Sequence, residues 1–126
     1  MASDALDSWQ TERARRLDEL VAVHPAFGGG RRGTWPATQL NHALALRLAI
    51  ECEGFSRELH DLAARTFGEW SAADDVRLGR IISTVMVDRR RLDRGNATRD
   101  HLSDDFSRFG LRLWPVIRAR EPRTAA

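Results

Sequence analysis

The chain contains no lysine, no tyrosine and only one cysteine, Cys52. One cysteine excludes an internal disulfide, and a free thiol fits a reducing compartment. We expect Cys52 to act as a small apolar side chain in a core helix. No apolar run is long enough to cross a bilayer. The acidic Asp4 and Asp7 do not fit a secretory signal peptide. We therefore expect a cytoplasmic protein, with no membrane partner and one domain over residues 1–126.

All 20 basic residues are arginine. A GC-rich genome explains such a preference. Phosphate recognition is the functional alternative, because guanidinium groups bind phosphate through two hydrogen bonds at once. The formal net charge is only +2, so a nucleic-acid site would depend on local clusters. These clusters are Arg13/Arg15/Arg16, Arg31/Arg32, Arg89/Arg90/Arg91/Arg94 and Arg118/Arg120/Arg123.

Hydrophobic periodicity predicts helices over residues 4–22, 37–68 and 72–92, and a fourth helix or helix pair from Leu102 to Trp114. Residues 24–36 are rich in glycine and proline and predict a flexible loop. No segment alternates apolar and polar residues as a strand does. Residues 121–126 are expected to fray. The sequence thus predicts an all-α fold, a bundle of four or five helices.

Local signals predict where these helices begin, end and face the core. Ser3 and Ser71 are expected N-caps, Gly68 an expected stop, and Pro115 opens or kinks the last turn. Two sets of side chains are expected to face inward: Leu40, Leu44, Leu48, Phe55, Leu59 and Leu62 in the long helix, and Val76, Ile81, Ile82, Val85 and Met86 in the next. The long helix is predicted to lie between other helices.

Acidic and histidine side chains interrupt these apolar stripes. Glu51 and Glu53 fall within the long helix, and Glu53, Arg57 and His60 share one helix face. That face is either a charge ladder at the surface or one side of a polar groove. His42 and His60 are separated by ~27 Å of helix and cannot share a metal. No histidine, cysteine and carboxylate set has metal-ligand spacing, so we expect neither a metal nor a cofactor.

The segment from Arg94 to His101 carries chemistry that no other segment offers. Metal-free RNA cleavage needs a base for the 2′-hydroxyl, an acid for the leaving 5′-oxygen and a cation for the phosphate. His101 can transfer one proton and Arg94 can bind the phosphate, and a symmetric dimer would supply two copies of each. On spacing alone, the structural interpretation is favoured, in which Arg94 caps one helix and His101 lies near the start of the next. A separate alternative lies in the loop from Gly28 to Gly33. Its glycines and the adjacent Arg31 and Arg32 could bind a nucleotide or small molecule.

Three segments resemble the HEPN superfamily of small all-α domains, in particular its RiboL-PSP-HEPN branch. Residues 40–46 (LNHALAL), with Ile50–Phe55 and Glu58-Leu59, are similar to the helix of that branch that carries a leucine-asparagine pair and a Glu-x-aromatic motif. Arg94 and His101, with six residues between them, match the Arg-x(4–6)-His motif. The run from Gly95 through Asp105–Leu111 to Trp114 is similar to the closing helix. The resemblance covers about residues 35–120.

The resemblance implies an up-down helical bundle, a homodimer and, in many members, metal-independent endoribonuclease activity in toxin–antitoxin or antiphage systems. The catalytic roles would then fall on Arg94 and His101, with a supporting acidic role for Glu53. Arg89, Arg90, Arg91 and Arg99 are the candidate RNA phosphate ligands. Partners would be RNA or a cognate antitoxin or toxin. Some members do not cleave RNA, so a helical protein–protein interaction module is the alternative.

Overall fold

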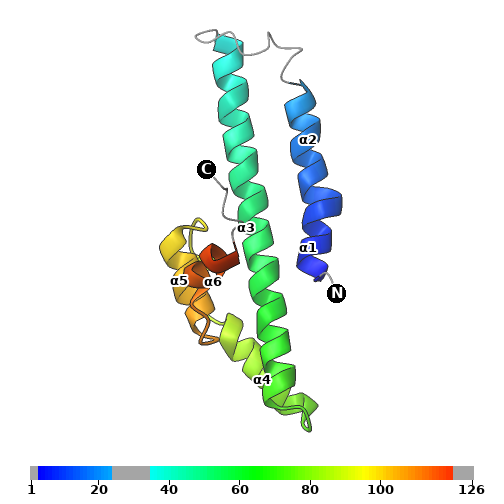
Figure 1. Ribbon diagram of the computed structural model, residues 1–126, viewed down its shortest axis with the longest axis vertical. Helices are drawn as coiled ribbons and strands as arrows, with labels where there is room; N and C mark the ends of the chain where they lie inside the picture. The colour runs from blue at the N-terminus through cyan, green and yellow to red at the C-terminus, as the bar shows by residue number, and fades with distance from the viewer. Residues whose placement is uncertain (1–2, 24–34, 121–126) are drawn as a thin grey trace. The chain divides into compact units, whose positions relative to one another are not determined.

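The computed structural model describes residues 3–23 and 35–120, and every regular element in these ranges is helical (Figure 1). The elements are α1 (Asp4–Ser8), the π-helical turn η1 (Trp9–Arg13), α2 (Ala14–Val23), α3 (Trp35–Ser71), α4 (Val76–Val87), the 3-10 turn η3 (Arg91–Asp93), α5 (Arg99–Ser107) and α6 (Leu113–Arg120). The all-α prediction is confirmed for these residues. The predicted tail, and residues 24–34 of the predicted loop with Arg31 and Arg32, lie outside them.

The chain divides into two compact units, residues 1–58 and 59–126, and the boundary falls within the long helix α3. Within the described ranges, no helix is both long enough and apolar enough to pass through a bilayer.

In the first unit, one continuous helical segment pairs with the first part of α3. Ser3 accepts a hydrogen bond from the Leu6 N–H and caps α1, as predicted. The π-helical turn η1 follows. Trp9 then packs against Phe55, with ring centroids 5.3 Å apart. The apolar core of this unit is small, because Ala5 and Ala37 are the only buried apolar residues among those described in it. Cys52 is exposed, so the prediction of a buried thiol is wrong.

Helix α4 is shorter than predicted, and its cap is Asp75 rather than Ser71. The Asp75 carboxylate accepts hydrogen bonds from the Arg77 and Leu78 N–H groups, whereas Ser71 is the last residue of α3. The helix ends at Val87, because Asp88 has extended backbone angles and Arg89 has a positive φ of 53°. The arginines predicted for its last turn therefore lie beyond the helix.

Glycines allow α3 and α4 to approach each other closely. Gly68 and Gly79 are both buried, and a Cβ atom added to Gly68 would overlap the Gly79 carbonyl oxygen. Gly68 is therefore a helix-crossing residue, and the prediction that it stops the helix is wrong. Side chains at this crossing would separate the two backbones.

The second unit has a small aromatic core. Phe106 is buried, and its ring contacts those of His60 and Phe109 with centroids 5.3 and 6.2 Å apart. Phe67 extends the cluster, 5.9 Å from Phe109. Gly110 follows α5 with a φ of +72° and lies between the last two helices.

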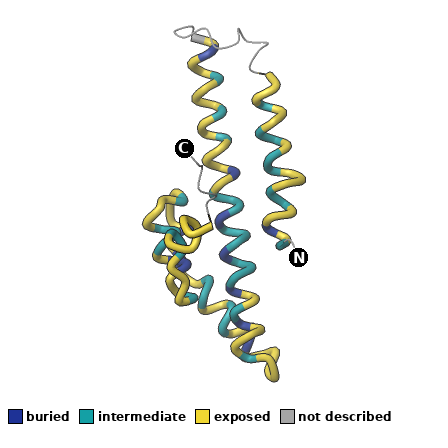
Figure 2. The backbone as a smooth tube through the Cα atoms, in the orientation of Figure 1, coloured by how far each residue is buried: buried dark blue, intermediate teal, exposed yellow. Residues whose placement is uncertain are grey.

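Much of α4 faces outward, contrary to the prediction. Figure 2 shows the buried residues gathered along the part of α3 in this unit, whereas α4 is largely exposed. Val76, Ile81 and Val85 are 69%, 60% and 63% exposed. The close Gly68–Gly79 crossing explains the difference, because α4 turns its small-residue face, rather than its branched side chains, toward α3.

Candidate functional site

Arg94 and His101 lie on either side of a short link in the second unit. Arg94 follows η3 and is exposed, whereas His101 is half-buried in the first turn of α5. Thr98 caps α5, because its hydroxyl accepts the His101 N–H at 3.2 Å. This cap fixes where the helix starts and therefore where His101 sits.

The His101 imidazole is held by the link that precedes it. Its Nδ1 lies 2.8 Å from the Asn96 carbonyl oxygen. A carbonyl can only accept, so Nδ1 carries the proton and Nε2 keeps a lone pair in the neutral ring. The ring packs beside Gly95, where an added Cβ would lie 3.4 Å from the His101 Cε1, an ordinary contact distance. The ring is thus oriented with one nitrogen free to take a proton.

The Arg94 guanidinium makes no hydrogen bond or ion pair with any residue that the structure describes. It is therefore available to an anion. No hydrogen bond joins Arg94 to His101 either, so the two residues share a link of backbone rather than a direct contact.

The four candidate phosphate ligands have different environments. Arg89 is exposed and lies 3.8 Å from the Asp88 carboxylate. Arg91 forms an ion pair with Asp104. The Arg99 guanidinium stacks over Trp114, 5.5 Å from the ring centroid. Each of these three has an exposed side to offer.

Arg90 differs from the other three, because it is buried. Its Nη1 donates to Asp61 at 2.5 Å and its Nε donates to Asp93 at 2.9 Å. A guanidinium that is buried and bonded in this way has a structural role, and it is not accessible to RNA in this conformation. From the sequence alone, nothing indicates that Arg90 is the buried residue of the run Arg89–Arg91.

Arg90 belongs to a polar cluster that was not predicted from the sequence. Its members His60, Arg90 and Asp105 are buried, whereas Asp61 and Asp93 are partly exposed. Asp105 is completely buried, and its two carboxylate oxygens accept the N–H groups of Arg91 and Leu92, each at 2.8 Å. It therefore caps η3 from a helix that follows later in the chain. In the sequence, nothing separates Asp105 from the exposed Asp104 beside it.

His60 is the centre of this cluster. Its Nε2 lies 3.2 Å from the Asp105 carbonyl and its Nδ1 lies 3.5 Å from the Arg90 Nη1. The carbonyl and the guanidinium together fix a neutral ring that donates through Nε2 and accepts through Nδ1. Burial lowers the pKa of His60, and the Arg90 charge lowers it further, against the opposing effect of the bond to Asp105. The ring is a structural acceptor rather than a proton carrier.

Glu53 lies in the first unit, half-buried, with a carboxylate oxygen 3.7 Å from the Arg57 guanidinium. The more constrained carboxylate is Glu51, which is 1% exposed. It receives Arg13 at 2.8 Å, Arg47 at 2.7 Å and Arg16 at 3.6 Å.

Three guanidinium groups outweigh the burial of Glu51. Burial alone would raise the pKa of this carboxyl group, but the hydrogen bond from Arg13 and the charges of Arg47 and Arg16 hold it below its usual value. Arg13 also pairs with Glu58, and this hydrogen bond raises the pKa of the Arg13 guanidinium. Gly54 leaves space for that guanidinium, which a Cβ would overlap.

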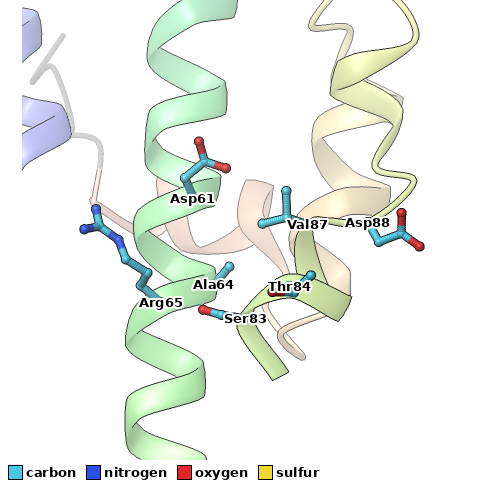
Figure 3. A pocket seen from close by; sticks show the side chains of 7 residues that line it. All are labelled: Asp61, Ala64, Arg65, Ser83, Thr84, Val87 and Asp88. Carbon is cyan, nitrogen blue, oxygen red and sulfur yellow. The ribbon is translucent and has the colours of Figure 1, made fainter. Parts of the chain in front are cut away.

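Several hollows of the second unit are large enough for a ligand, and two of them, of about 620 and 560 Å³, lie on different pairs of helices. A pocket of about 620 Å³ lies between α3 and α4 (Figure 3). Ala64 and Ser83 face each other across the helices, whereas Arg65 and Asp88 point away from the space between them. None of the candidate RNA-binding or catalytic residues lines this pocket.

The second hollow, of about 560 Å³, is formed by α5 and the start of α6, and we call it the α5–α6 groove. Its walls include Arg99, Ser103, Arg112, Trp114 and Arg118. The α5 turn that carries His101 thus also supplies one wall of a basic and aromatic groove.

Among the described residues, no three histidine, cysteine, aspartate or glutamate side chains are grouped so that they could hold a metal ion. Comparison with known proteins identifies no relative: no family model, no curated protein and no solved structure matches the chain.

Proposed function

We propose that this chain is a HEPN-like RNA-binding protein and metal-independent endoribonuclease, with His101 and Arg94 as its catalytic residues. The observation that supports this most directly is the 2.8 Å bond from His101 Nδ1 to the Asn96 carbonyl. It holds the ring in the tautomer that a general base requires, with Nε2 unprotonated. The resemblance of residues 94–114 to the closing helix of RiboL-PSP-HEPN domains supports the same assignment.

In the proposed reaction, His101 Nε2 takes the proton of the ribose 2′-hydroxyl. The 2′-oxygen then attacks the adjacent phosphorus and the bond to the 5′-oxygen breaks, which leaves a 2′,3′-cyclic phosphate. Arg94 stabilises the additional negative charge on the phosphate. Glu53 is proposed as a supporting acidic group through its resemblance to the family, and its visible partner is Arg57.

One histidine cannot be base and acid in the same step, so the leaving 5′-oxygen needs a second proton donor. We propose that a symmetric homodimer supplies it, with His101 of the second copy in the protonated form. Such a protein would act in the cytoplasm, as a toxin or an antiphage component whose activity a cognate partner controls.

The test is incubation of the purified chain with single-stranded and structured RNAs in EDTA, beside His101→Ala. We expect cleavage by the wild type with cyclic-phosphate ends, and loss of at least roughly 100-fold in rate in the variant. His42→Ala is the matched control, because His42 is exposed on α3. Equal cleavage by wild type and His101→Ala, or none by either, would contradict the assignment.

A helical protein–protein interaction module is the second candidate. It is favoured by the uncovered apolar side chains of Leu78, Ile81 and Val85, which share one face of α4, because an exposed apolar patch often marks an interaction surface. We expect Ile81→Asp with Val85→Asp to dissociate a complex that light scattering detects in the wild type. A wild-type chain that is monomeric and binds no partner would remove this candidate.

A further inference from the structure

We infer that the α5–α6 groove binds single-stranded RNA, with one unpaired base stacked on Trp114 and the neighbouring phosphates on Arg112 and Arg118. This inference rests on the proposed function, since it names the class of RNA and the residues that hold it. The groove has a volume of about 560 Å³.

Trp114 has the properties of a stacking platform. Its indole N–H donates to the Ser103 hydroxyl at 2.7 Å and lies 3.2 Å from the Arg99 carbonyl oxygen. These bonds fix the plane of the ring while it stays half-buried. A ring that is already ordered loses little side-chain entropy when a base stacks on it.

The Arg99 guanidinium marks the part of the ring that a planar cation already occupies, 5.5 Å from its centroid. A base offers the ring a similar flat partner. If a base replaces the guanidinium there, Arg99 is released to bind the phosphate of the same nucleotide. Arg99 would thus stack on Trp114 in the free protein and bind phosphate in the RNA complex.

The charges of the groove favour an anion. The Arg112 guanidinium has no ion-pair or hydrogen-bond partner among the described residues, and the Arg118 Nε donates one long hydrogen bond to the Trp114 carbonyl, at 3.4 Å. Of the two carboxylates on the rim, Asp104 is already neutralised by Arg91. Three arginines therefore face a single unneutralised carboxylate, Asp100.

A single strand fits these features better than a duplex. In an A-form helix each base is stacked on its neighbours and has no free face, whereas an unpaired base can leave the strand and stack on an aromatic ring. Arg99 and Asp100 of the groove are chain neighbours of His101 in the first turn of α5, although His101 itself does not line the groove.

The test measures binding separately from cleavage. In the His101→Ala background, fluorescence anisotropy gives the Kd for a labelled twelve-nucleotide oligouridine and for a blunt RNA duplex at one salt concentration. We expect the single strand to bind more tightly, and Trp114→Ala to weaken that binding roughly 5- to 100-fold. Trp114→Phe keeps an aromatic face and should retain most of the affinity. Trp70→Ala removes an exposed tryptophan outside the groove and should change nothing.

Arg112→Gln with Arg118→Gln provides a second measurement that does not depend on the packing of Trp114. Removing two phosphate contacts should lower the slope of log Kd against log salt by about 1.4, at about 0.7 per contact for a single strand. Circular dichroism verifies that each variant is folded.

The outcomes separate the two proposals. If wild-type protein cleaves RNA but the Trp114 and arginine variants bind as tightly as their parent, RNA binding in the groove is contradicted. The proposed catalytic role of His101 is then unaffected. Tighter binding of the duplex also overturns the groove. If the wild type cleaves nothing and the His101→Ala protein binds neither RNA, the proposed function fails together with the groove.

Discussion

The two units bury polar groups in different ways. The first unit surrounds one carboxylate, Glu51, with three arginines, so its buried charge is balanced by other charges. The second unit surrounds a neutral imidazole, His60, with a backbone carbonyl and a guanidinium. A charge-balanced cluster depends on keeping every ion, whereas the histidine cluster depends on one ring staying neutral. The two units should therefore fail under different substitutions and at different pH.

The largest effect is expected from Asp105→Ala in the second unit. The change leaves the buried N–H groups of Arg91 and Leu92 without an acceptor. Each unsatisfied group costs about 1–3 kcal/mol, so the free energy of unfolding should fall by roughly 3–5 kcal/mol. Urea denaturation of the variant measures it.

Asp104→Ala is the matched control, since this neighbouring carboxylate is exposed and pairs only with Arg91 among the described side chains. Its loss should cost less than about 1 kcal/mol. Equal losses for the two variants would show that the Asp105 cap is not a main support of the unit.

Glu51→Gln is expected to be next, and it tests the first unit. Three guanidinium groups would lose their shared charge partner. Breaking a buried pair costs about 3–5 kcal/mol. Since Arg16 and Arg47 can regain water at side-chain exposures of 42% and 38%, we expect about 2–3 kcal/mol by the same measurement.

Glu53→Gln serves as its control, because Glu53 is half-buried and its ion pair with Arg57 is long, at 3.7 Å. We expect less than about 1 kcal/mol. A loss as large as that of Glu51→Gln would mean that the first unit does not depend on its buried carboxylate in particular.

Substitutions at two glycines test how tightly each unit is packed. In Gly68→Ala, the new methyl group meets the Gly79 backbone, which cannot move without separating the helices. Overpacking of this kind costs about 1–3 kcal/mol. In Gly54→Ala, the methyl group meets the Arg13 guanidinium, which can shift but then loosens its bonds to Glu51 and Glu58. The gain in helix propensity of about 1 kcal/mol offsets part of that loss.

Thermal denaturation of both glycine variants should thus give a clearly lower Tm for Gly68→Ala and a smaller decrease for Gly54→Ala. The reverse order would show that the α3–α4 crossing is looser than the structure describes.

The smallest effect is the dependence of stability on pH, which should separate the two clusters. The pKa of His60 is lowered in the folded state by burial. The unfolded chain therefore binds a proton that the folded chain does not, so this stability is present above the ordinary pKa of 6.5 and is lost as the pH falls below it. The lowered pKa of Glu51 has the same sign, but its loss begins only below the ordinary 4.5.

Unfolding free energies between pH 7.5 and 5 should therefore decline in the wild type and be flatter in His60→Gln. His42→Gln, at an exposed position, should keep the wild-type decline. A wild-type curve that is level over this range would contradict the role of His60.

Periodicity predicted the existence of the helices well and their ends less well. The prediction for residues 37–68 corresponds to α3, because a long apolar repeat has few alternative structures. The third helix was predicted over 72–92 and spans Val76–Val87, since Ser71 and Asp75 are both good caps and only the turn geometry selects Asp75. Val76 and Ile81 were predicted to face inward because they are apolar. The apolar pattern does not reveal that α4 contacts α3 through a glycine.

For the candidate site, the sequence identified the segment but not its environment. The link from Arg94 to His101, its glycine turn and the start of a new helix were all predictable from local signals. The acceptor of the His101 hydrogen bond, the Asn96 carbonyl, is also close in the chain. Every residue has a backbone carbonyl, so the sequence does not indicate which one accepts this bond. The α5–α6 groove depends on Trp114 folding back on Arg99 and Ser103.

What the sequence determined by itself is whatever depends on neighbours in the chain: an all-helical chain, caps such as Ser3, the break at Gly110, and the presence of arginine and histidine in one link. Only the tertiary structure decided which of several identical side chains are buried. Glu51 rather than Glu53, Arg90 rather than Arg89, and Asp105 rather than Asp104 lie in the interior. The reason is physical, because burying a charge is costly without partners, and each of these groups has a partner far away in the chain: Arg13 is 38 residues from Glu51, Asp61 is 29 from Arg90 and Leu92 is 13 from Asp105.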